Sequence, residues 1–440
     1  MKRFTHRFSR REALLMGLSL SAGAALAACG GSGGGDAGGE ISDKPVTLRF
    51  TWWGSDARHK RTQQVIDAFT KAHPTITIKG EFKDWNGYWD ALATTVAAND
   101  APDVIQMDEL YLASYAERGA LLDLKTADKH LTTADFDTKA LATGAIGDKQ
   151  YGVPTGLAAY SFVANTDLLD KYQVTLPDDA TWSWDDLKTV AAQISKASGG
   201  KVTGTQSLGF DIGGVNVWAR QHGATLYSPE GKVALPPDVL ASFWQFQLDL
   251  AKDGSAPQAS VTVERAGAAL DQSGTATNAS ALGTWWNSQL TSLAAASGQK
   301  LKLLKLPGES QATTPGAYYK PSMFWSVSSR SKQPAEAALF VDFLANSEAA
   351  AEILQTDRGV PANTKIRSAL VPKLTATDKA AAEYLDAIKV GDSPRVTPKG
   401  ASDVEQILKR YTEDVLFARK TPADAATGFV KELQAAIDAA

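Results

Sequence analysis

The chain has 440 residues, of which 44% are hydrophobic and 21% are charged. Because a single hydrophobic core stops growing at roughly 250 to 300 residues, this length predicts two or three domains. The composition excludes a largely disordered chain and a polytopic membrane protein. The formal net charge of −4 argues against a nucleic-acid partner, and the single cysteine allows no internal disulfide and no cysteine-rich zinc site.

The first 28 residues have the pattern of an export signal. Five basic residues lie from Lys2 to Arg11, and an uncharged apolar run of 16 residues follows from Ala13 to Ala28. This run is shorter than the roughly 20 residues that a membrane span needs. It ends in Leu26-Ala27-Ala28-Cys29, which resembles a bacterial lipobox, where signal peptidase cuts before the cysteine and the thiol carries lipid. We therefore expect residues 1–28 to be removed and Cys29 to be lipidated.

Two further features concern export and anchoring. Ser9-Arg10-Arg11 is similar to a twin-arginine export motif, but Ala13 occupies the place of the customary Phe, so the general secretory and twin-arginine routes both stay open. Gly30 to Gly39 contains seven glycines, a composition typical of a flexible linker. We expect residues 29–44 to tether an exported, acidic body to the outer face of the cytoplasmic membrane, at the cell surface or in the periplasm.

After the linker, the hydrophobic pattern alternates between strands and helices. It predicts strands at Val46–Trp52, Thr75–Ile78 and Val104–Met107, with helices at Ala57–Ala72 and from about Gly87 onward. Three strands joined by two helices form a βαβαβ unit, and the handedness of such crossovers makes the sheet parallel. The sequence therefore predicts an α/β fold.

The residues at the ends of these strands have the aromatic and charged side chains that could bind a ligand. They are Trp52-Trp53-Gly54, Lys83-Asp84-Trp85 and Met107-Asp108-Glu109, and open parallel sheets bind ligands beyond the carboxyl ends of their strands. A tryptophan ring suits the apolar C–H face of a pyranose, and a carboxylate suits its hydroxyl groups. A phosphate would instead need a glycine-rich loop and a lysine. Strand residues alternate between faces, so we expect one of Trp52 and Trp53 to be buried.

Nine short segments after the linker form a recognisable series. They are Val46–Gly54, Asp67–Pro74, Ala101–Asp108, Tyr151–Gly156, Asn165–Leu169, Thr181–Leu187, Ala281–Asn287, Pro334–Ala338 and Arg358–Ala362. In their order and spacing, and in company with the lipobox, they resemble the extracellular solute-binding proteins of ABC importers, in particular the carbohydrate-binding group related to maltose-binding protein. The resemblance covers nearly the whole mature chain, and it is specific to the family but not to a ligand.

This resemblance implies a two-lobed periplasmic-binding-protein fold. Each lobe has a mostly parallel sheet flanked by helices, and a hinge joins the lobes beside a cleft. It places residues 45–154 and 310–358 in the N-terminal lobe and residues 155–309 and 359–440 in the C-terminal lobe. It further implies a monomer that binds a small carbohydrate, delivers it to the permease subunits of an ABC importer, needs no cofactor or metal, and contacts the membrane through Cys29.

Transferred residue by residue, the resemblance also predicts the ligand-binding side chains. They are Trp53, Asp56, Trp85 and Asp108 from the first lobe, Trp218, Trp285 and Trp286 from the second, Tyr318 and Tyr319 where the chain re-enters the first lobe, and Arg358 near the last crossing. The sequence leaves open which tryptophan of each adjacent pair faces the cleft. It also leaves open whether Arg358 binds hydroxyl groups or forms a structural salt bridge.

Two other classes of function remain as alternatives. A secreted carbohydrate-active hydrolase needs only two carboxylates about 5 to 10 Å apart, although the four dispersed histidines after the signal peptide argue against a catalytic zinc. A binding protein for a polyol, a glycoside or a peptide would carry the same overall pattern. We expect a binding protein rather than an enzyme.

Overall fold

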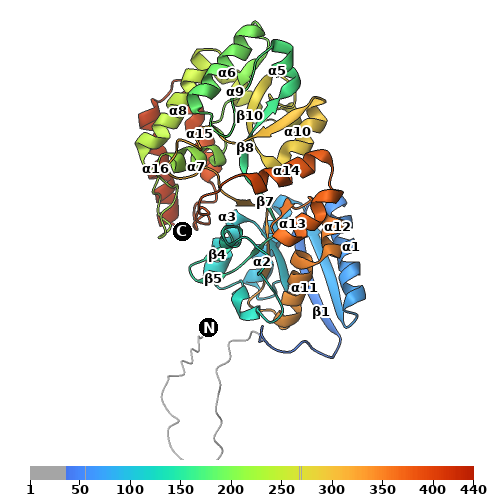
Figure 1. Ribbon diagram of the computed structural model, residues 1–440. Coiled ribbons are helices and arrows are strands. Elements are labelled where there is room, and N and C mark those ends of the chain that lie inside the picture. Colours follow the sequence, from blue (N-terminus) through green and yellow to red (C-terminus); the bar gives the residue numbers. More distant parts are fainter. Residues whose placement is uncertain (1–35, 55, 267, 269) are drawn as a thin grey trace, which may run out of the picture. The chain divides into compact units, whose positions relative to one another are not determined.

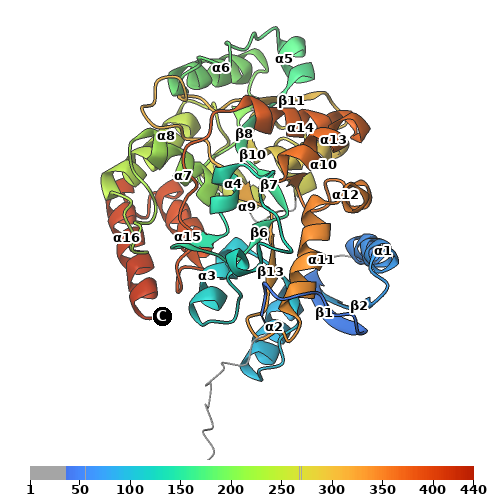
Figure 2. The ribbon, with the colours of Figure 1, turned by 60° about the horizontal axis from the view of Figure 1, so that its bottom comes forward.

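The computed structural model describes residues 36–54, 56–266, 268 and 270–440. These residues belong to one compact unit, in which two separate sheets form the centres of two lobes, as Figure 1 and Figure 2 show. The predicted signal peptide and the predicted lipidation site Cys29 lie outside the described residues. In the part of the chain that is described, no helix is both long and apolar enough to cross a membrane.

The first lobe is built on a five-stranded sheet. Its strands are β1 (Val46–Trp53), β2 (Ile76–Lys83), β3 (Val104–Met107), β6 (Val153–Pro154) and β13 (Phe324–Val327), in the order β2-β1-β3-β13-β6. β1 pairs in parallel with β2 and β3, whereas β13 runs antiparallel to β3 and β6. The predicted parallel βαβαβ unit is therefore confirmed.

Helices cover both faces of this sheet. They are α1 (Asp56–Ala72), α2 (Trp85–Ala97), α3 (Glu109–Glu117), α4 (Thr138–Ala142), α11 (Pro334–Asn346) and α12 (Glu348–Leu354), beside the short strands β4 (Ala145–Ile146) and β5 (Lys149–Gln150). Phe69 of α1 packs in one core cluster with Trp52, while Tyr88 of α2 packs in another with Trp53. The two neighbouring tryptophans of β1 thus point to opposite faces, as strand alternation requires.

The second lobe is built on a four-stranded sheet in the order β11-β8-β10-β9. Its strands are β8 (Tyr160–Asn165), β9 (Thr203–Thr205), β10 (Ser280–Trp286) and β11 (Leu301–Leu304). Its helices are α5 (Thr166–Tyr172), α6 (Trp184–Ala197), α7 (Ile212–Gln221), α8 (Pro237–Lys252), α9 (Ala259–Ala266), α10 (Leu290–Ser297), α15 (Val404–Leu416) and α16 (Pro422–Asp438). Figure 1 shows α15 and α16 side by side with α7 and α8, and α16 packs against α8.

A small three-stranded sheet joins the lobes. It has the order β12-β7-β14, with β7 (Gly156–Ala158), β12 (Lys320–Pro321) and β14 (Val360–Pro361) all antiparallel to their neighbours. At Gly156, a Cβ atom would lie 2.2 Å from the carbonyl oxygen of Arg358, so only glycine allows this close approach of the strands. Three chain segments therefore form one hinge.

The lobe boundaries differ from the predicted ones in two places. Tyr318 packs in the second-lobe core and Tyr319 in the first, so the chain returns to the first lobe at about residue 319 rather than at residue 310. Residues from Val360 to Leu385 still pack in the first-lobe core cluster, including part of α14 (Ala376–Ala387), and α13 (Thr364–Leu370) packs against α12. The assignment of 359–440 to the second lobe is therefore wrong for residues 360–370, which form β14 and α13. α14 also contacts α10 and β11 of the second lobe, so this helix lies between the two lobes.

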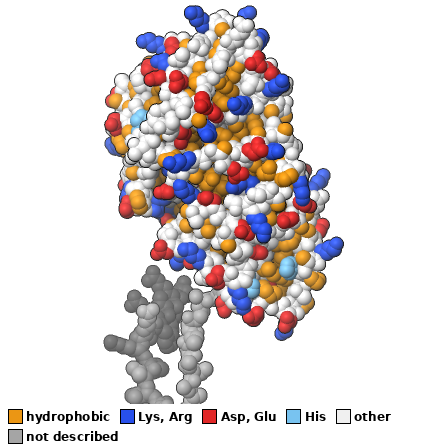
Figure 3. All heavy atoms as spheres, viewed as in Figure 1, with side chains coloured by type: hydrophobic (Ala, Val, Ile, Leu, Met, Phe, Trp, Pro, Cys, Tyr) orange, Lys and Arg blue, Asp and Glu red, His pale blue; other side chains and the backbone are white. Residues whose placement is uncertain are grey.

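The predicted tether also differs from the structure. Its described part, from residue 36, is packed against the first lobe, and Ala37 is buried in that lobe's core cluster. The expectation of a free linker through residue 44 is therefore wrong for this part. On the face drawn in Figure 3, acidic and basic side chains are interspersed over both lobes, so binding selectivity has to come from local groups rather than from one charged face.

Candidate ligand-binding site

A cavity with a volume of about 460 Å³ lies where the two lobes and the hinge meet. The first lobe contributes residues from α2, α3 and the segment after α4; the second contributes residues from α7 and the segment after it; the hinge contributes residues next to β12. In that order, the lining includes Trp85, Asp108, Glu109, Thr143, Asn216, Arg220, Tyr227, Tyr318, Tyr319 and Lys320. We call this cavity the cleft.

The first-lobe wall of the cleft carries an aromatic ring at its rim. Trp85 is the first residue of α2, and its side chain is 37% exposed. Asp84 caps this helix by accepting a hydrogen bond from the backbone N–H of Gly87, which fixes where the helix starts. The buried ring of Trp53 lies edge-on to Trp85 at a centroid distance of 5.1 Å. Trp53 therefore supports the exposed ring from behind.

Two carboxyl groups and one ammonium group form the floor of the cleft. Asp108 caps α3 by accepting a hydrogen bond from the backbone N–H of Leu110 at 3.0 Å. The next residue, Glu109, forms an ion pair of 2.8 Å with the Nζ atom of Lys320 in the hinge strand β12. Burial raises the pKa of Asp108 to about 6, against the smaller opposing effect of Lys320. Burial lowers the pKa of Lys320, but Glu109 and Asp108 more than offset this and raise it above its usual value.

The second-lobe wall presents polar groups held by a tyrosine. Asn216 of α7 donates a hydrogen bond from Nδ2 to the hydroxyl oxygen of Tyr318 at 3.3 Å. Arg220, one turn further along α7, places its guanidinium group 5.5 Å from the centre of the Tyr318 ring. Its Nη2 atom donates to the carbonyl oxygen of Asp392 at 2.7 Å. These contacts hold the polar side chains of this wall in place.

Trp286 lies directly behind the cleft. Its ring is edge-on to Tyr160 at 4.9 Å and to Tyr318 at 6.1 Å, and Lys320 places its Nζ atom 5.5 Å from the ring centre. A Cβ atom at Gly213 would lie 2.7 Å from the Trp286 ring, so the start of α7 needs glycine to admit it. Trp286 thus connects the hinge lysine with the core of the second lobe.

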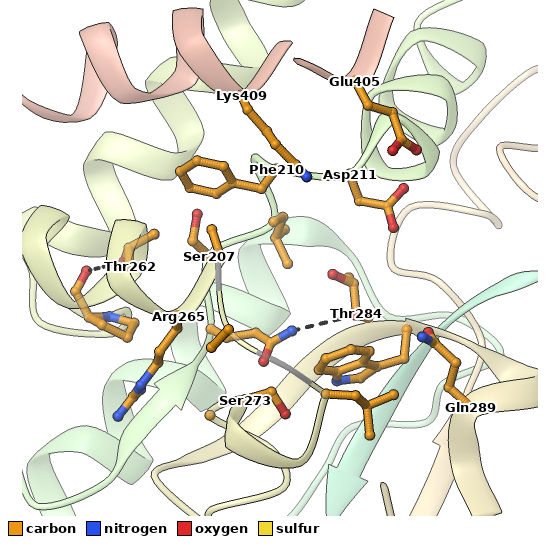
Figure 4. A pocket seen from close by; sticks show the side chains of 18 of the residues that line it. Ser207, Phe210, Asp211, Thr262, Arg265, Ser273, Thr284, Gln289, Glu405 and Lys409 are labelled. Atoms are coloured by element: carbon orange, nitrogen blue, oxygen red, sulfur yellow. Dashed lines mark hydrogen bonds between the residues drawn. The ribbon is translucent and has the colours of Figure 1, made fainter. Parts of the chain in front are cut away.

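A second cavity of about 360 Å³ lies within the second lobe. Figure 4 shows Asp211, Glu405 and Lys409 on one side of it and Thr284 and Gln289 on the other. The ring of Trp285 lines this cavity and donates a hydrogen bond from Nε1 to Thr275 at 2.9 Å. Burial raises the pKa of Asp211 to about 6, although the carboxylate caps α7 through the backbone N–H of Gly213.

The two cavities are neighbours. Glu405 of α15 lines both of them. Asp211 lines the second cavity, and the next residue, Ile212, lines the cleft. The start of α7 therefore separates two compartments, one between the lobes and one inside the second lobe.

The structure brings together only some of the predicted site residues. Trp85, Asp108, Tyr318 and Tyr319 line the cleft. Trp53 and Trp286 lie behind it and contact its lining residues. Trp285 lines the second cavity instead, and Asp56, exposed at the start of α1, lines neither.

The prediction that Trp218 binds the ligand is wrong. The Trp218 ring is buried in the second-lobe core, where it packs against Trp184 and Phe246 at 5.2 and 5.4 Å. Its Nε1 atom donates to Ser242 at 3.0 Å. The ring is enclosed because α8 covers this face of α7, so it offers no platform to a ligand.

Of the two roles that the sequence left open for Arg358, the structure shows the structural one. Arg358 is 3% exposed, and its guanidinium group donates to Gln106 at 2.9 Å and to Thr62 at 2.8 Å. It also forms an ion pair with Asp357 and lies 5.1 Å from the centre of the Trp325 ring. The structural alternative therefore holds, because these partners tie β14 to the first-lobe core and occupy the donors that a sugar would use.

Sequence reasoning missed several lining residues. Glu109 stands at a predicted strand end but is not among the predicted ligand-binding residues, and neither is Lys320, which follows Tyr319. Their ion pair joins segments more than 200 residues apart. Asp211 carried a detectable signal, since an acid before Ile-Gly-Gly is a typical helix cap. The segment from Asp392 to Thr397 lines the cleft without any aromatic residue. No group of described residues has the arrangement that would hold a metal ion.

Comparison with known proteins assigns the family. The model of the family described as bacterial extracellular solute-binding protein matches residues 64–383. The chain belongs to this family. A solved structure described as extracellular solute-binding protein family 1, from Alicyclobacillus acidocaldarius, is 30% identical and covers 90% of this chain and 99% of its own, with a TM-score of 0.75. The two-lobed α/β fold is therefore the fold of this solute-binding protein.

Two curated relatives match over shorter regions. An uncharacterised lipoprotein of Streptomyces antibioticus is 29% identical over 160 residues, which are 36% of this chain and 35% of the relative. The diacetylchitobiose-binding protein DasA of Streptomyces coelicolor is 27% identical over 171 residues, which are 38% of this chain and 39% of the relative. The matched regions thus span little more than a third of these relatives.

Proposed function

We propose that this solute-binding protein captures a sugar or oligosaccharide in the cleft and delivers it to the permease of an ABC importer. The observation that carries the proposal is the lining of the cleft, where aromatic rings and charged groups from both lobes surround one cavity of about 460 Å³. This volume lies within the range of small-molecule sites, which usually combine apolar walls with a few convergent polar groups.

The lining suits a carbohydrate chemically. The rings of Trp85, Tyr227 and Tyr318 offer apolar surfaces for C–H groups. Asp108 and Asn216 offer acceptors and donors for hydroxyl groups, and charge-assisted hydrogen bonds to a carboxylate are stronger than neutral ones. The name of the Streptomyces coelicolor relative, a diacetylchitobiose-binding protein, supports the same class of ligand.

Capture follows from the hinge. A sugar bound between the walls contacts Trp85 and Asp108 on one lobe and Asn216 on the other only when the lobes are close together. Because the closed form offers more contacts than an open one, the ligand shifts the population towards closure. The closed outer surface is then what the permease recognises.

Export and anchoring complete the proposal. We propose that the chain is exported, cleaved before Cys29 and lipidated there, and that it works as a monomer without turning over its ligand. The lipobox-like Leu26-Ala27-Ala28-Cys29 supports this, as does the lipoprotein among the relatives. Mass spectrometry of the membrane fraction would detect a diacylated Cys29, and an unmodified N-terminus there would contradict the anchor.

A ligand screen tests the central claim. Purified residues 29–440 are screened by thermal shift against mono- and oligosaccharides, with polyols and peptides in the same plate, and hits are titrated by calorimetry. We expect one saccharide class to raise the midpoint and to bind with 1:1 stoichiometry, while chromatography detects no cleavage. Stabilisation by polyols or peptides alone would contradict a sugar ligand, and cleavage would show an enzyme.

A pair of variants localises the binding. Lys320→Met removes the ammonium group from the cleft floor and leaves Glu109 without its partner, so we expect weaker binding. Phe417→Ala removes an exposed aromatic ring that lines neither cavity, so its affinity should equal that of the wild type. Equal affinities in both variants would place the ligand outside the cleft.

A further inference from the structure

The segment that precedes β1 is folded onto the first lobe. We call residues 36–45 the strap. Ala37 of the strap is 5% exposed and belongs to the same core cluster as Leu124 and Leu131, and Ile41 packs against that cluster. The strap therefore makes specific apolar contacts with the first lobe, although its sequence is part of a glycine-rich segment.

Polar contacts fix the strap as well. The backbone N–H of Ser42 donates to the Oε1 atom of Glu336 at 2.8 Å. Glu336, in the first turn of α11, is 3% exposed, and no other described residue donates to its carboxyl group. A buried carboxylate without a partner is costly, so Glu336 favours the docked strap. The carbonyl oxygen of Gly39 lies 2.6 Å from Nε2 of His130, and Glu40 forms an ion pair with Lys129.

The strap lies at the pole of the first lobe opposite the cleft. The parallel strands β1 and β2 run from this pole towards the cleft, where Trp85 follows β2 directly. Val104, at the start of β3, pairs with Val327, and Leu122 near the strap contacts donates its N–H to Val327. β1 has eight residues, which span about 26 Å at ~3.3 Å per residue. Figure 1 shows the strap at the lower end of this lobe.

We propose that the strap fixes the membrane attachment at this pole and shortens the tether, so that the first lobe stays nearer to the lipid surface than the second lobe. This rests on the proposed lipid anchor at Cys29. Seven residue steps separate Cys29 from Asp36, which reach at most about 25 Å at ~3.6 Å per residue. Without the strap, the 17 steps from Cys29 to Val46 would reach about 60 Å. Docking therefore removes more than half of the reach.

The consequence concerns the membrane as a partner surface. With the short tether, the strap pole stays close to the lipid head groups, whereas the second lobe can lie farther from them. Releasing the strap lengthens the tether and lets the whole body tumble and move away. The strap thus limits how far the cleft can move from a permease in the same membrane.

The test measures distances to the membrane. The mature chain is coupled through the thiol of Cys29, its one cysteine, to maleimide-bearing lipid in phosphatidylcholine vesicles that also carry an acceptor dye on their head groups. A fluorescent non-canonical residue replaces either Asp128, near the strap, or Lys196, at the end of α6 in the second lobe. Energy transfer to the lipid dye is then compared between the two positions.

Strap variants supply the comparison. Ala37→Asp places a charge in the core, and Ser42→Pro removes the donor to Glu336, so both release the strap; Asp43→Asn changes an exposed strap residue and serves as the control. We expect transfer from position 128 to exceed transfer from position 196 several-fold in the wild type and in Asp43→Asn. The difference should shrink markedly in both release variants, in which amide hydrogen exchange at residues 37–42 also becomes fast.

Equal transfer from the two positions in the wild type would overturn the proposal. So would release of the strap, shown by fast exchange, without a change in transfer. Because the thiol is coupled chemically, these outcomes do not depend on whether the cell lipidates Cys29 or on which ligand the cleft binds.

Discussion

Two tryptophan pairs end strands in the two lobes, and their surroundings differ. In β1, Trp52 and Trp53 are both buried, because α1 covers one face of the sheet and α2 the other. In β10, Trp285 and Trp286 are both only partly buried. Trp285 faces the second cavity, and Trp286 lies between the hinge and Tyr160. The residue type and the strand position are the same, so the covering elements decide which ring a ligand can reach.

The difference shows how each lobe contributes to the cleft. In the first lobe, the strand-end tryptophans form a fixed base, and the ring at the surface is Trp85 from the following loop. In the second lobe, the strand itself carries Trp285, which lines the second cavity, and Trp286, which lies behind the cleft. A short 3₁₀ turn at Asn287–Gln289 and then α10 follow this strand. The first lobe thus presents one exposed ring over a buried aromatic base, and the second lobe holds a separate compartment lined by acidic, basic and hydroxyl side chains.

The largest expected effect is on stability and concerns the first pair. Trp52→Ala removes a fully buried ring, in contact with Phe50 and His59, and should lower the free energy of unfolding by about 3 to 5 kcal/mol. Guanidinium unfolding of the variant and of Phe417→Ala measures this, and the latter should change stability by less than about 0.5 kcal/mol. Near-wild-type stability of Trp52→Ala would show that Trp52 is not structural.

The second pair should affect binding. Trp285→Ala and Trp286→Ala should each weaken sugar binding by about 1 to 3 kcal/mol if the ring contacts the ligand. Calorimetry gives the affinity, and the thermal midpoint separates the two rings, because Trp286 also packs against Tyr160 and Tyr318. Unchanged affinity in both variants would exclude these two tryptophans from the binding site and leave Tyr227 and Tyr318 as the rings of the second lobe.

A smaller effect is expected for the exposed ring of the first lobe. Trp85→Ala removes a side chain that is 37% exposed in the unliganded protein, so the thermal midpoint should stay close to that of the wild type. Loss of an aromatic contact should weaken sugar binding by about 0.5 to 1.5 kcal/mol. A marked loss of stability with normal affinity would assign Trp85 to the scaffold, together with Trp53.

The smallest effect is a dependence on pH. Burial raises the pKa of Asp108 to about 6, so its carboxyl group is ionised at pH 7 and largely protonated at pH 5. An ionised carboxylate accepts stronger hydrogen bonds from hydroxyl groups, so sugar affinity should fall a few-fold as the pH drops below 6. Asp108→Asn should flatten this part of the profile, and an unchanged profile would exclude Asp108 from binding.

The same group has the opposite effect on the stability of the unliganded protein. Asp108 binds its proton more tightly in the folded chain than in the unfolded chain, where its pKa is about 3.9. Between about pH 4 and 6 the folded state therefore holds more protons, and its contribution to the free energy of unfolding falls as the pH rises. Urea unfolding of the wild type and of Asp108→Asn, compared at about pH 4 and at about pH 6, measures this contribution.

Local patterns predicted the parts of the molecule that local rules govern. The βαβαβ unit followed from hydrophobic spacing, and Trp85 and Asp108 followed from the rule that ligands lie beyond strand ends. Trp218 and Arg358 could not be placed in this way, because burial depends on distant partners. Gln106, which accepts a hydrogen bond from Arg358, is 252 residues away in sequence. Glu109, the ion-pair partner of Lys320, lies in the first lobe, whereas Lys320 lies in the hinge strand β12. Such pairs form only when the hinge brings the segments together.

The hinge also determines how late in synthesis the first-lobe core can form. Because its three strands come from distant parts of the chain, the first-lobe core includes side chains from Ala37 to Leu385. A ribosome must therefore make almost the whole polypeptide before this core can close, and non-local contacts of this kind fold slowly. A nascent chain that stays open until synthesis is nearly finished is well matched to passage through a narrow export channel, with folding left to the far side of the membrane.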